Sequence, residues 1–158
     1  MADLELIRTP GDRRRLELEG IGTLRIERSR RATAEAGGVA WQFDHRFWKA
    51  VAEATDLAGG LAGKYVGGRR DGTLRWGERE FTLRQASFLR YALADGEREL
   101  VLLDWTPRFR DVWDKRPAKI TVEDPAALEP GLLLFAFYVA WHRMMNDAIA
   151  FGHAASGG

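Results

Sequence analysis

One segment of this 158-residue chain combines residue types that can bind an anion: TPRFRDVWDKRPAK, residues 106–119. Its candidate contact residues are Arg108, Arg110, Trp113, Lys115, Arg116 and Lys119. Basic side chains beside aromatic ones suit the boundary of a lipid surface, where charged ends reach polar headgroups and rings lie between water and hydrocarbon. The alternative is an ordinary loop, because Asp111 and Asp114 offset part of the charge and arginine stems also cover apolar protein surface.

Acid–base or nucleophilic chemistry has little support in the residue pattern. Asp44 and His45 are adjacent in FDHRFW, but neighbouring residues of a strand point to opposite faces of the sheet. The three serines, Ser29, Ser87 and Ser156, lie in no nucleophile motif such as G-x-S-x-G. We therefore predict no catalytic residues and no enzymatic activity, and we assign His45 a structural role.

The glycine-rich stretch GGLAGKYVGGRR, residues 59–70, matches a phosphate-binding loop only in part. That loop requires G-x-x-x-x-G-K-[ST], whereas Ala58 occupies the first glycine position and Tyr65 follows Gly63-Lys64. Glycines in a tightly curved sheet explain the stretch better. Three scattered histidines without cysteine, and acidic residues without EF-hand spacing, predict neither a metal nor a cofactor.

Composition restricts the possible partners. The formal net charge is +1, so no strong overall field attracts the chain to nucleic acid, and we predict no nucleic-acid partner. The absence of cysteine excludes disulfides, thiol catalysis and palmitoylation. The beginning of the sequence, MADLELIRTPGDRRR, has no apolar core of the kind found in a secretory signal. We expect a cytoplasmic protein.

The elements that position these residues are predicted to be strands over the first three-quarters of the chain. Apolar and charged residues alternate on both sides of a glycine-containing turn in residues 15–30, 73–84 and 87–105, which is typical of hairpins. AKITVE, residues 118–123, predicts a last strand. RRATAEAGG, residues 30–38, lacks clear alternation of large apolar residues, and we expect a helical turn or a loop there.

The pattern changes near the end of the chain, in PGLLLFAFYVAWHRMM. Pro130 suits the first turn of a helix, and the ten residues from Leu132 to Trp141 are all apolar. A membrane-spanning helix needs about 20 such residues, and His142 and Arg143 end this run. A helix that is apolar on every side must be surrounded by protein. We therefore predict a helix at about 130–145 enclosed by a closed β-sheet, and no membrane span.

This combination resembles the tubby C-terminal-like superfamily. The residues that carry the resemblance are KITVEDP, residues 119–125, followed by the apolar helix and its short polar exit. The most similar branch is that of the LURP-one-related and phospholipid-scramblase-like proteins, which includes small bacterial members. The resemblance implies a barrel around a central helix, and an anionic lipid headgroup or a partner protein as ligand. It assigns no site residues, and the palmitoylated cysteines of animal scramblases have no counterpart here.

The sequence therefore predicts an all-β fold with one buried C-terminal helix. We expect a closed antiparallel barrel of roughly 10–12 strands, formed by a single domain over residues 1–150 with a flexible tail at 151–158. The expected function is that of a non-enzymatic binding or scaffold protein, cytoplasmic or peripheral at the membrane. The alternative is a barrel that binds a small apolar ligand, or an enzyme without a recognisable motif. The sequence does not indicate an oligomeric state.

Overall fold

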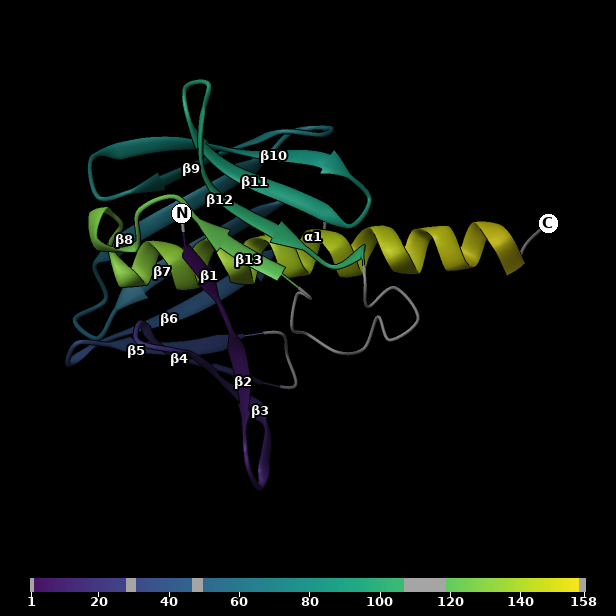
Figure 1. Ribbon diagram of the computed structural model, residues 1–158. Helices are drawn as coiled ribbons and strands as arrows, with labels where there is room; N and C mark the ends of the chain where they lie inside the picture. Colours follow the sequence, from purple (N-terminus) through teal and green to yellow (C-terminus); the bar gives the residue numbers. More distant parts are fainter. Residues whose placement is uncertain (1, 28–30, 47–49, 107–118, 157–158) are drawn as a thin grey trace.

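A computed structural model of the chain describes residues 2–27, 31–46, 50–106 and 119–156. For Arg13 and residues 148–156 it describes the backbone only. The described residues form thirteen strands in one antiparallel sheet, a short 3₁₀ turn η3 and a long helix α1 (Figure 1). The strands are β1 Ala2–Leu4, β2 Leu6–Thr9, β3 Asp12–Leu18, β4 Gly22–Ile26, β5 Ala32–Ala36, β6 Val39–Arg46, β7 Val51–Asp56, β8 Leu61–Gly67, β9 Gly72–Trp76, β10 Arg79–Ser87, β11 Arg90–Asp95, β12 Arg98–Asp104 and β13 Lys119–Val122.

The sheet curls into a nearly closed barrel because its two outermost strands are consecutive in the chain. From β2 to β13 each strand pairs with the next one in the chain, and β1 pairs with β13, so β1 and β2 are the outermost strands. Only Glu5 separates β1, which pairs with β13, from β2, which pairs with β3. The N-terminal segment thus joins both edges of the sheet, which hides edges that would otherwise be open to other chains.

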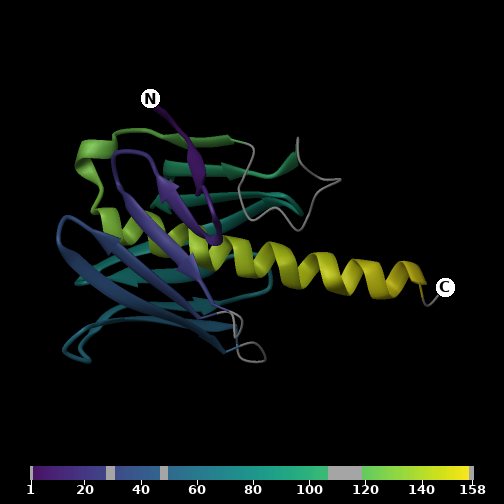
Figure 2. The same ribbon diagram turned by 90° about the horizontal axis from the view of Figure 1, so that it is seen from below.

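Helix α1 (Pro130–Ser156) runs through this barrel. It enters after η3 (Pro125–Ala127), where the Asp124 carboxylate caps the turn by accepting a hydrogen bond from the backbone N–H of Ala126 at 3.1 Å. Figures 1 and 2 show strands on opposite sides of the helix and the C-terminal part of α1 extending beyond the sheet. We call the two ends of the barrel the entry end, where α1 begins, and the exit end.

The interior of the barrel is filled by the helix. All ten residues from Leu132 to Trp141 are buried, most with no more than 3% of their surface exposed. The Phe135 ring lies 5.1 Å from that of Phe43 and 5.9 Å from that of Trp76. A side chain at Gly131 would collide with Trp76, since its Cβ would lie 2.4 Å from the indole ring. The predicted fold, a β-barrel wrapped around a hydrophobic helix, is confirmed.

Two expectations about individual elements are corrected. Residues 32–36 form strand β5 rather than a helical turn or a loop, and their alternating buried residues Ala32, Ala34 and Ala36 face the helix. Small side chains on this wall let α1 pack close to it, but they give a weak hydrophobic signal. The helix also does not end at about residue 145: it continues to Ser156, through part of the segment expected to be a flexible tail.

Candidate functional site: the exit end of the barrel

Polar side chains converge where α1 leaves the barrel. Arg143 and Asp147 are four residues apart and therefore lie on the same side of the helix. Inward-facing residues of the surrounding strands meet them: Tyr65 of β8, and Gln85 and Tyr91 of β10 and β11. These five residues form the exit cluster. Its contacts hold the helix in one axial position in the barrel.

Arg143 connects the helix to β8 and to the loop that follows it. Its Nη1 donates a hydrogen bond to the Tyr65 hydroxyl at 2.5 Å. Its Nη2 lies 3.4 Å from the carbonyl oxygens of both Gly68 and Arg69. The guanidinium group presents several donors in a fixed plane, so a single side chain can hold the strand end and the loop at once.

Asp147 makes the matching connection on the other side of the cluster. Its Oδ2 accepts a hydrogen bond from Gln85 Nε2 at 2.8 Å and lies 3.5 Å from the Tyr91 hydroxyl. Gln85 Nε2 is also 3.3 Å from that hydroxyl. The two charges of the helix therefore each bind a tyrosine of the barrel wall.

Both tyrosine hydroxyls are held in the neutral form. Burial raises the pKa of Tyr65 above its ordinary value of 10.0, although the nearby Arg143 charge acts in the opposite direction. Burial also raises the pKa of Tyr91, and the adjacent Asp147 carboxylate raises it further. Neither tyrosine is suited to act as a base near neutral pH.

A pair of histidines lies beside the exit cluster. The ring of His45 stacks on the ring of His142 with centroids 4.8 Å apart and planes 3° apart. Tyr138 and Trp141 meet the His142 ring edge-on at 4.4 and 4.7 Å. His142 is only 1% exposed, so this pair is enclosed mainly by aromatic side chains. The structural role predicted for His45 agrees with this packing.

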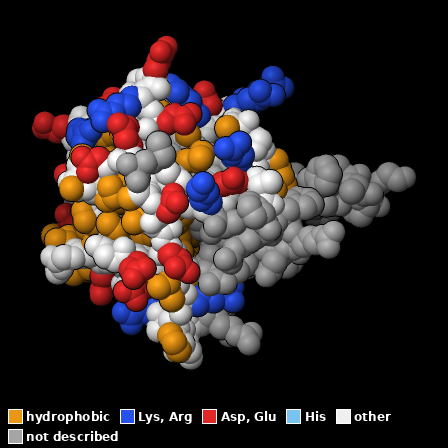
Figure 3. Space-filling view, viewed as in Figure 1, with side chains coloured by type: hydrophobic (Ala, Val, Ile, Leu, Met, Phe, Trp, Pro, Cys, Tyr) orange, Lys and Arg blue, Asp and Glu red, His pale blue; other side chains and the backbone are white. Residues whose placement is uncertain are grey.

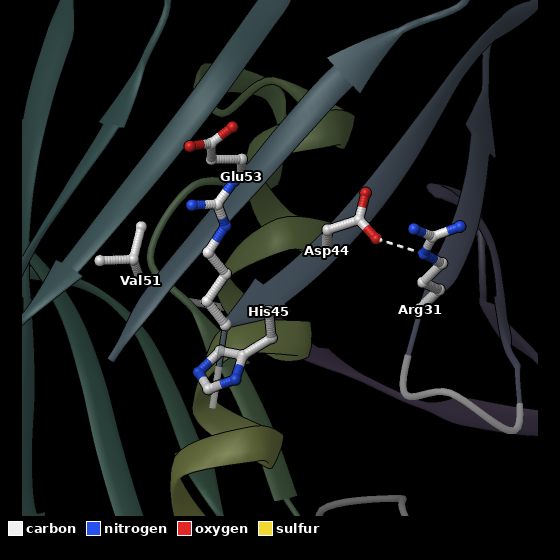
Figure 4. A pocket seen from close by; sticks show the side chains of 6 residues that line it. Arg31, Asp44, His45, Val51 and Glu53 are labelled. Carbon is white, nitrogen blue, oxygen red and sulfur yellow. Dashed lines mark ion pairs between the residues drawn. The ribbon is translucent and has the colours of Figure 1, made fainter. Parts of the chain in front are cut away.

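Asp44 and His45 take opposite faces of β6, as their adjacency predicts. Figure 4 shows the Asp44 carboxylate turned to Arg31, whose Nε lies 2.8 Å from its Oδ1, while the imidazole of His45 turns to the helix. Both line a cleft of about 550 Å³ that Arg31, Arg46, Val51 and Glu53 complete. The cleft has two guanidinium and two carboxylate groups, so its charge is nearly balanced.

Three arginines face solvent at the exit end: Arg46, the last residue of β6, and Arg69 and Arg70, which follow β8; we call them the basic rim. A hydrogen bond of 2.7 Å from the Gly67 N–H to the Ala50 carbonyl joins the end of β8 to the residue before β7. Among the residues that the structure describes, none of the three forms an ion pair. A smaller cleft of about 260 Å³ lies beside Arg70, next to the β10–β11 turn.

Most of the predicted anion-binding segment lies outside the described residues. This applies to Arg108, Arg110, Trp113, Lys115 and Arg116. Lys119 is described: it is exposed and begins β13.

The described flanks of that segment both belong to the exit end. Lys119 is in register with Asp104, the last residue of β12, and Asp104 is in register with Arg90 of β11. The chain therefore leaves β12 and returns to β13 at the same end of the barrel as the basic rim.

The glycine-rich stretch at 59–70 is strand β8 with its flanking turns, as the sequence favoured. A Cβ at Gly63 would lie 2.5 Å from the Trp76 ring, so the close approach of that ring explains the glycine. Within the described part of the chain, no three His, Asp or Glu side chains are grouped as metal ligands. No described helix is both long enough and apolar enough to cross a membrane.

Sequence reasoning did not find the exit cluster. Arg143 and Asp147 were visible as the polar end of an apolar run, but nothing in the spacing of Tyr65, Gln85 and Tyr91 showed that these residues would meet them. Arg69 and Arg70 resembled ordinary solvated loop charges. No family model matches the chain, and no curated protein or solved structure is significantly similar to it.

Proposed function

We propose that this chain is a non-enzymatic binding protein that docks on anionic phospholipid headgroups with its basic rim. The observation that carries the proposal is the position of the rim. Arg46, at the end of β6, and Arg69 and Arg70, after β8, are exposed and have no ion-pair partner among the described residues. Exposed arginines in such a group interact with several phosphates of one surface.

The buried helix supports a binding surface outside the barrel rather than inside it. The residues of α1 that would line a lumen, such as Phe135 and Tyr138, are fully buried against the strands. A small apolar ligand would have to displace them. The alternative of a ligand-carrying barrel is therefore less well supported than an external contact.

The charges at the entry end also favour docking of the exit end, rather than the entry end, on an anionic membrane. The turns of the entry end carry exposed acidic residues, which an anionic surface repels. Those residues are Glu19, Asp56, Glu78, Glu97, Asp124 and Glu129. Arg79 and Arg98 at that end are each ion-paired, with Asp95 at 3.8 Å and with Glu123 at 2.7 Å. The exit end also has exposed carboxylates, including Asp71 directly after Arg70, so the contrast between the two ends is one of degree.

Membership of the tubby C-terminal-like superfamily and a cytoplasmic location peripheral to the membrane belong to this proposal. The proposal also includes Arg108, Lys115 and Arg116, which lie outside the described residues; the described flanks Asp104 and Lys119 are at the exit end. The Val66 side chain, 49% exposed beside the rim, offers an apolar neighbour to the arginines.

Vesicle co-sedimentation tests the proposal. We expect binding to vesicles that contain phosphatidylserine or a phosphoinositide, none to pure phosphatidylcholine, and weaker binding at physiological than at low salt. Replacing Arg46, Arg69 and Arg70 together by Gln should weaken binding on the order of 100-fold, at about 1 kcal/mol for each basic residue.

The matched control removes three arginines from elsewhere on the surface: Arg75, Arg79 and Arg98, each replaced by Gln. The change in net charge is the same, but these side chains are ion-paired and lie toward the entry end. Equal loss in both triple variants would show that total charge, not the rim, controls binding. A third variant, with Arg108, Lys115 and Arg116 neutralised, reports on the adjoining segment.

A further inference from the structure

The entry end of the barrel exposes large apolar side chains. Leu57 is 86% exposed, Leu61 58% and Val39 49%. Isolated exposed apolar residues are common, but a contiguous group of them marks an interaction site more often than chance. Figure 3 shows hydrophobic side chains gathered at the entry end, on the left of that view, with acidic side chains among them.

Leu57 and Leu61 are neighbours at the tip of the β7–β8 hairpin, whereas Val39 lies on the helix-facing side of β6, the side of Trp41 and Phe43. Trp41 is in register with Asp56, so Val39, two residues before Trp41, lies next to the turn that begins at Asp56. Leu57 and Leu61 flank that turn, and Leu61 is in register with Thr55. We call Leu57 and Leu61 the apolar tip.

The turn itself does not require a leucine. Asp56 Oδ1 accepts hydrogen bonds from the backbone N–H groups of Ala58 at 2.9 Å and Gly60 at 2.8 Å, and these contacts fix the conformation. Position 57 has no structural constraint of that kind, and turns usually carry small or polar residues there. The conformation of the turn therefore does not explain why position 57 is a leucine.

Three carboxylates lie around the apolar tip. Asp56 belongs to the same turn, and Glu35 is in register with Ala40, one residue before the Trp41–Asp56 pair. Glu78 lies in the β9–β10 turn, which a hydrogen bond of 2.9 Å from the Gly77 N–H to the Ala62 carbonyl places beside the start of β8. Arg79, the first residue of β10, is engaged with Asp95 and with the ring of Phe81.

We propose that the apolar tip is a docking surface for a partner protein, which contacts it with a segment that carries Lys or Arg beside large apolar residues. Leu57 and Leu61 would pack against the apolar residues of that segment, while Glu35, Asp56 and Glu78 would face its basic ones. The same carboxylates repel an anionic membrane. This surface lies at the other end of the barrel from the basic rim and is separate from the proposed lipid contact.

A defined probe tests this surface: a fluorescent helical peptide with Leu on one face and Lys on the other, followed by anisotropy. The native protein should bind it, and binding should weaken with salt. Leu57→Ser combined with Leu61→Ser should weaken binding at least tenfold without changing the Tm, because both side chains are exposed. The control, Val66→Ser combined with Ile7→Ser, removes two exposed apolar side chains elsewhere and should bind as the native protein does.

Two results would contradict a protein-docking role for the apolar tip. The first is a Leu57/Leu61 variant that binds the peptide as tightly as the native protein does. The second is a native protein that binds a peptide with Glu in place of Lys as tightly as the Lys peptide. Loss of vesicle binding in the Leu57/Leu61 variant would assign the tip to a lipid surface instead. Self-association of the native protein that this variant abolishes would assign it to a second copy. Failure of the basic-rim experiment leaves the peptide result unaffected, so the two proposals are tested separately.

Discussion

At the scale of single residues, the exit cluster shows how a helix that is apolar on every side can have a defined position in its barrel. Apolar packing is not directional, and a helix of leucines and aromatics could slide or rotate with little change in buried area. Arg143 bound to Tyr65 and Asp147 bound to Gln85 fix one arrangement through hydrogen bonds. Charged groups in hydrogen bonds of this kind are costly to leave unpaired, so other arrangements are disfavoured.

The buried tyrosines lead to a prediction about alkaline pH. The folded pKa values of Tyr65 and Tyr91 are raised above that of an unfolded tyrosine. Below pH 10 both states hold these protons, and the two groups add no pH dependence. Above that pH the unfolded chain loses them first, so the free energy of unfolding should fall by about 1.4 kcal/mol per pH unit for each tyrosine.

Absorbance of tyrosinate, measured together with circular dichroism, checks this expectation. Tyr65 and Tyr91 should ionise only as the chain unfolds, and urea midpoints measured across the alkaline range should decrease. Replacing both by Phe should flatten that decrease. Ionisation of both tyrosines near pH 10 in a chain that keeps its native dichroism would contradict the burial and bonding described for the exit cluster.

At the scale of elements, alternation predicted the strands where large apolar residues carried it. Leu16 and Leu18, or Leu74 and Trp76, stand out against charged neighbours and are all buried as expected. Strand β5 was missed because alanine carries little of this signal, although Ala32, 34 and 36 are what the helix requires on that wall. Arg143 marks where α1 leaves the barrel, as expected, but the end of α1 was misplaced because the helix continues beyond that exit to Ser156.

The candidate site was only partly predictable for a related reason. A basic segment can be recognised from its composition, and the segment from Arg108 to Lys119 was predicted in this way. The basic rim depends on the end of β6 and the turn after β8 lying at the same end of the barrel, which the sequence alone does not show. Its members, Arg46 on one side and Arg69 and Arg70 on the other, are more than 20 residues apart in the chain.

Because α1 forms the core of the barrel, a single charged residue introduced into its buried part should strongly lower the free energy of unfolding. Phe135→Asp or Leu133→Asp should unfold the domain, because each places a carboxylate without a partner among apolar side chains. A buried unpaired charge costs roughly 3–5 kcal/mol, against a total stability of about 5–15 kcal/mol for a domain of ordinary size.

The control makes the same chemical change where the side chain is exposed. Leu57→Asp, at 86% exposure, should leave the Tm nearly unchanged. Thermal melts followed by circular dichroism compare the three variants. A Phe135→Asp protein that melts like the native protein would mean that α1 does not occupy the barrel interior.

At the scale of the whole molecule, the barrel has two chemically different ends. The interior is filled, which leaves the two rims and the outer wall as binding surfaces. Exposed arginines without ion-pair partners among the described residues lie at the exit end, and exposed carboxylates with an apolar tip at the entry end. This polarity is consistent with an adaptor that faces an anionic surface with one end and a protein with the other.

The most direct measurement uses the absence of cysteine from the chain, which allows a single label at either end. We would introduce Val66→Cys beside the basic rim, or Leu57→Cys at the apolar tip, and attach an environment-sensitive fluorophore. On addition of phosphoinositide-containing vesicles, the label at position 66 should shift to the blue and the label at position 57 should not. A shift at position 57, or no shift at either position, would contradict the proposal that the exit end docks on anionic lipid.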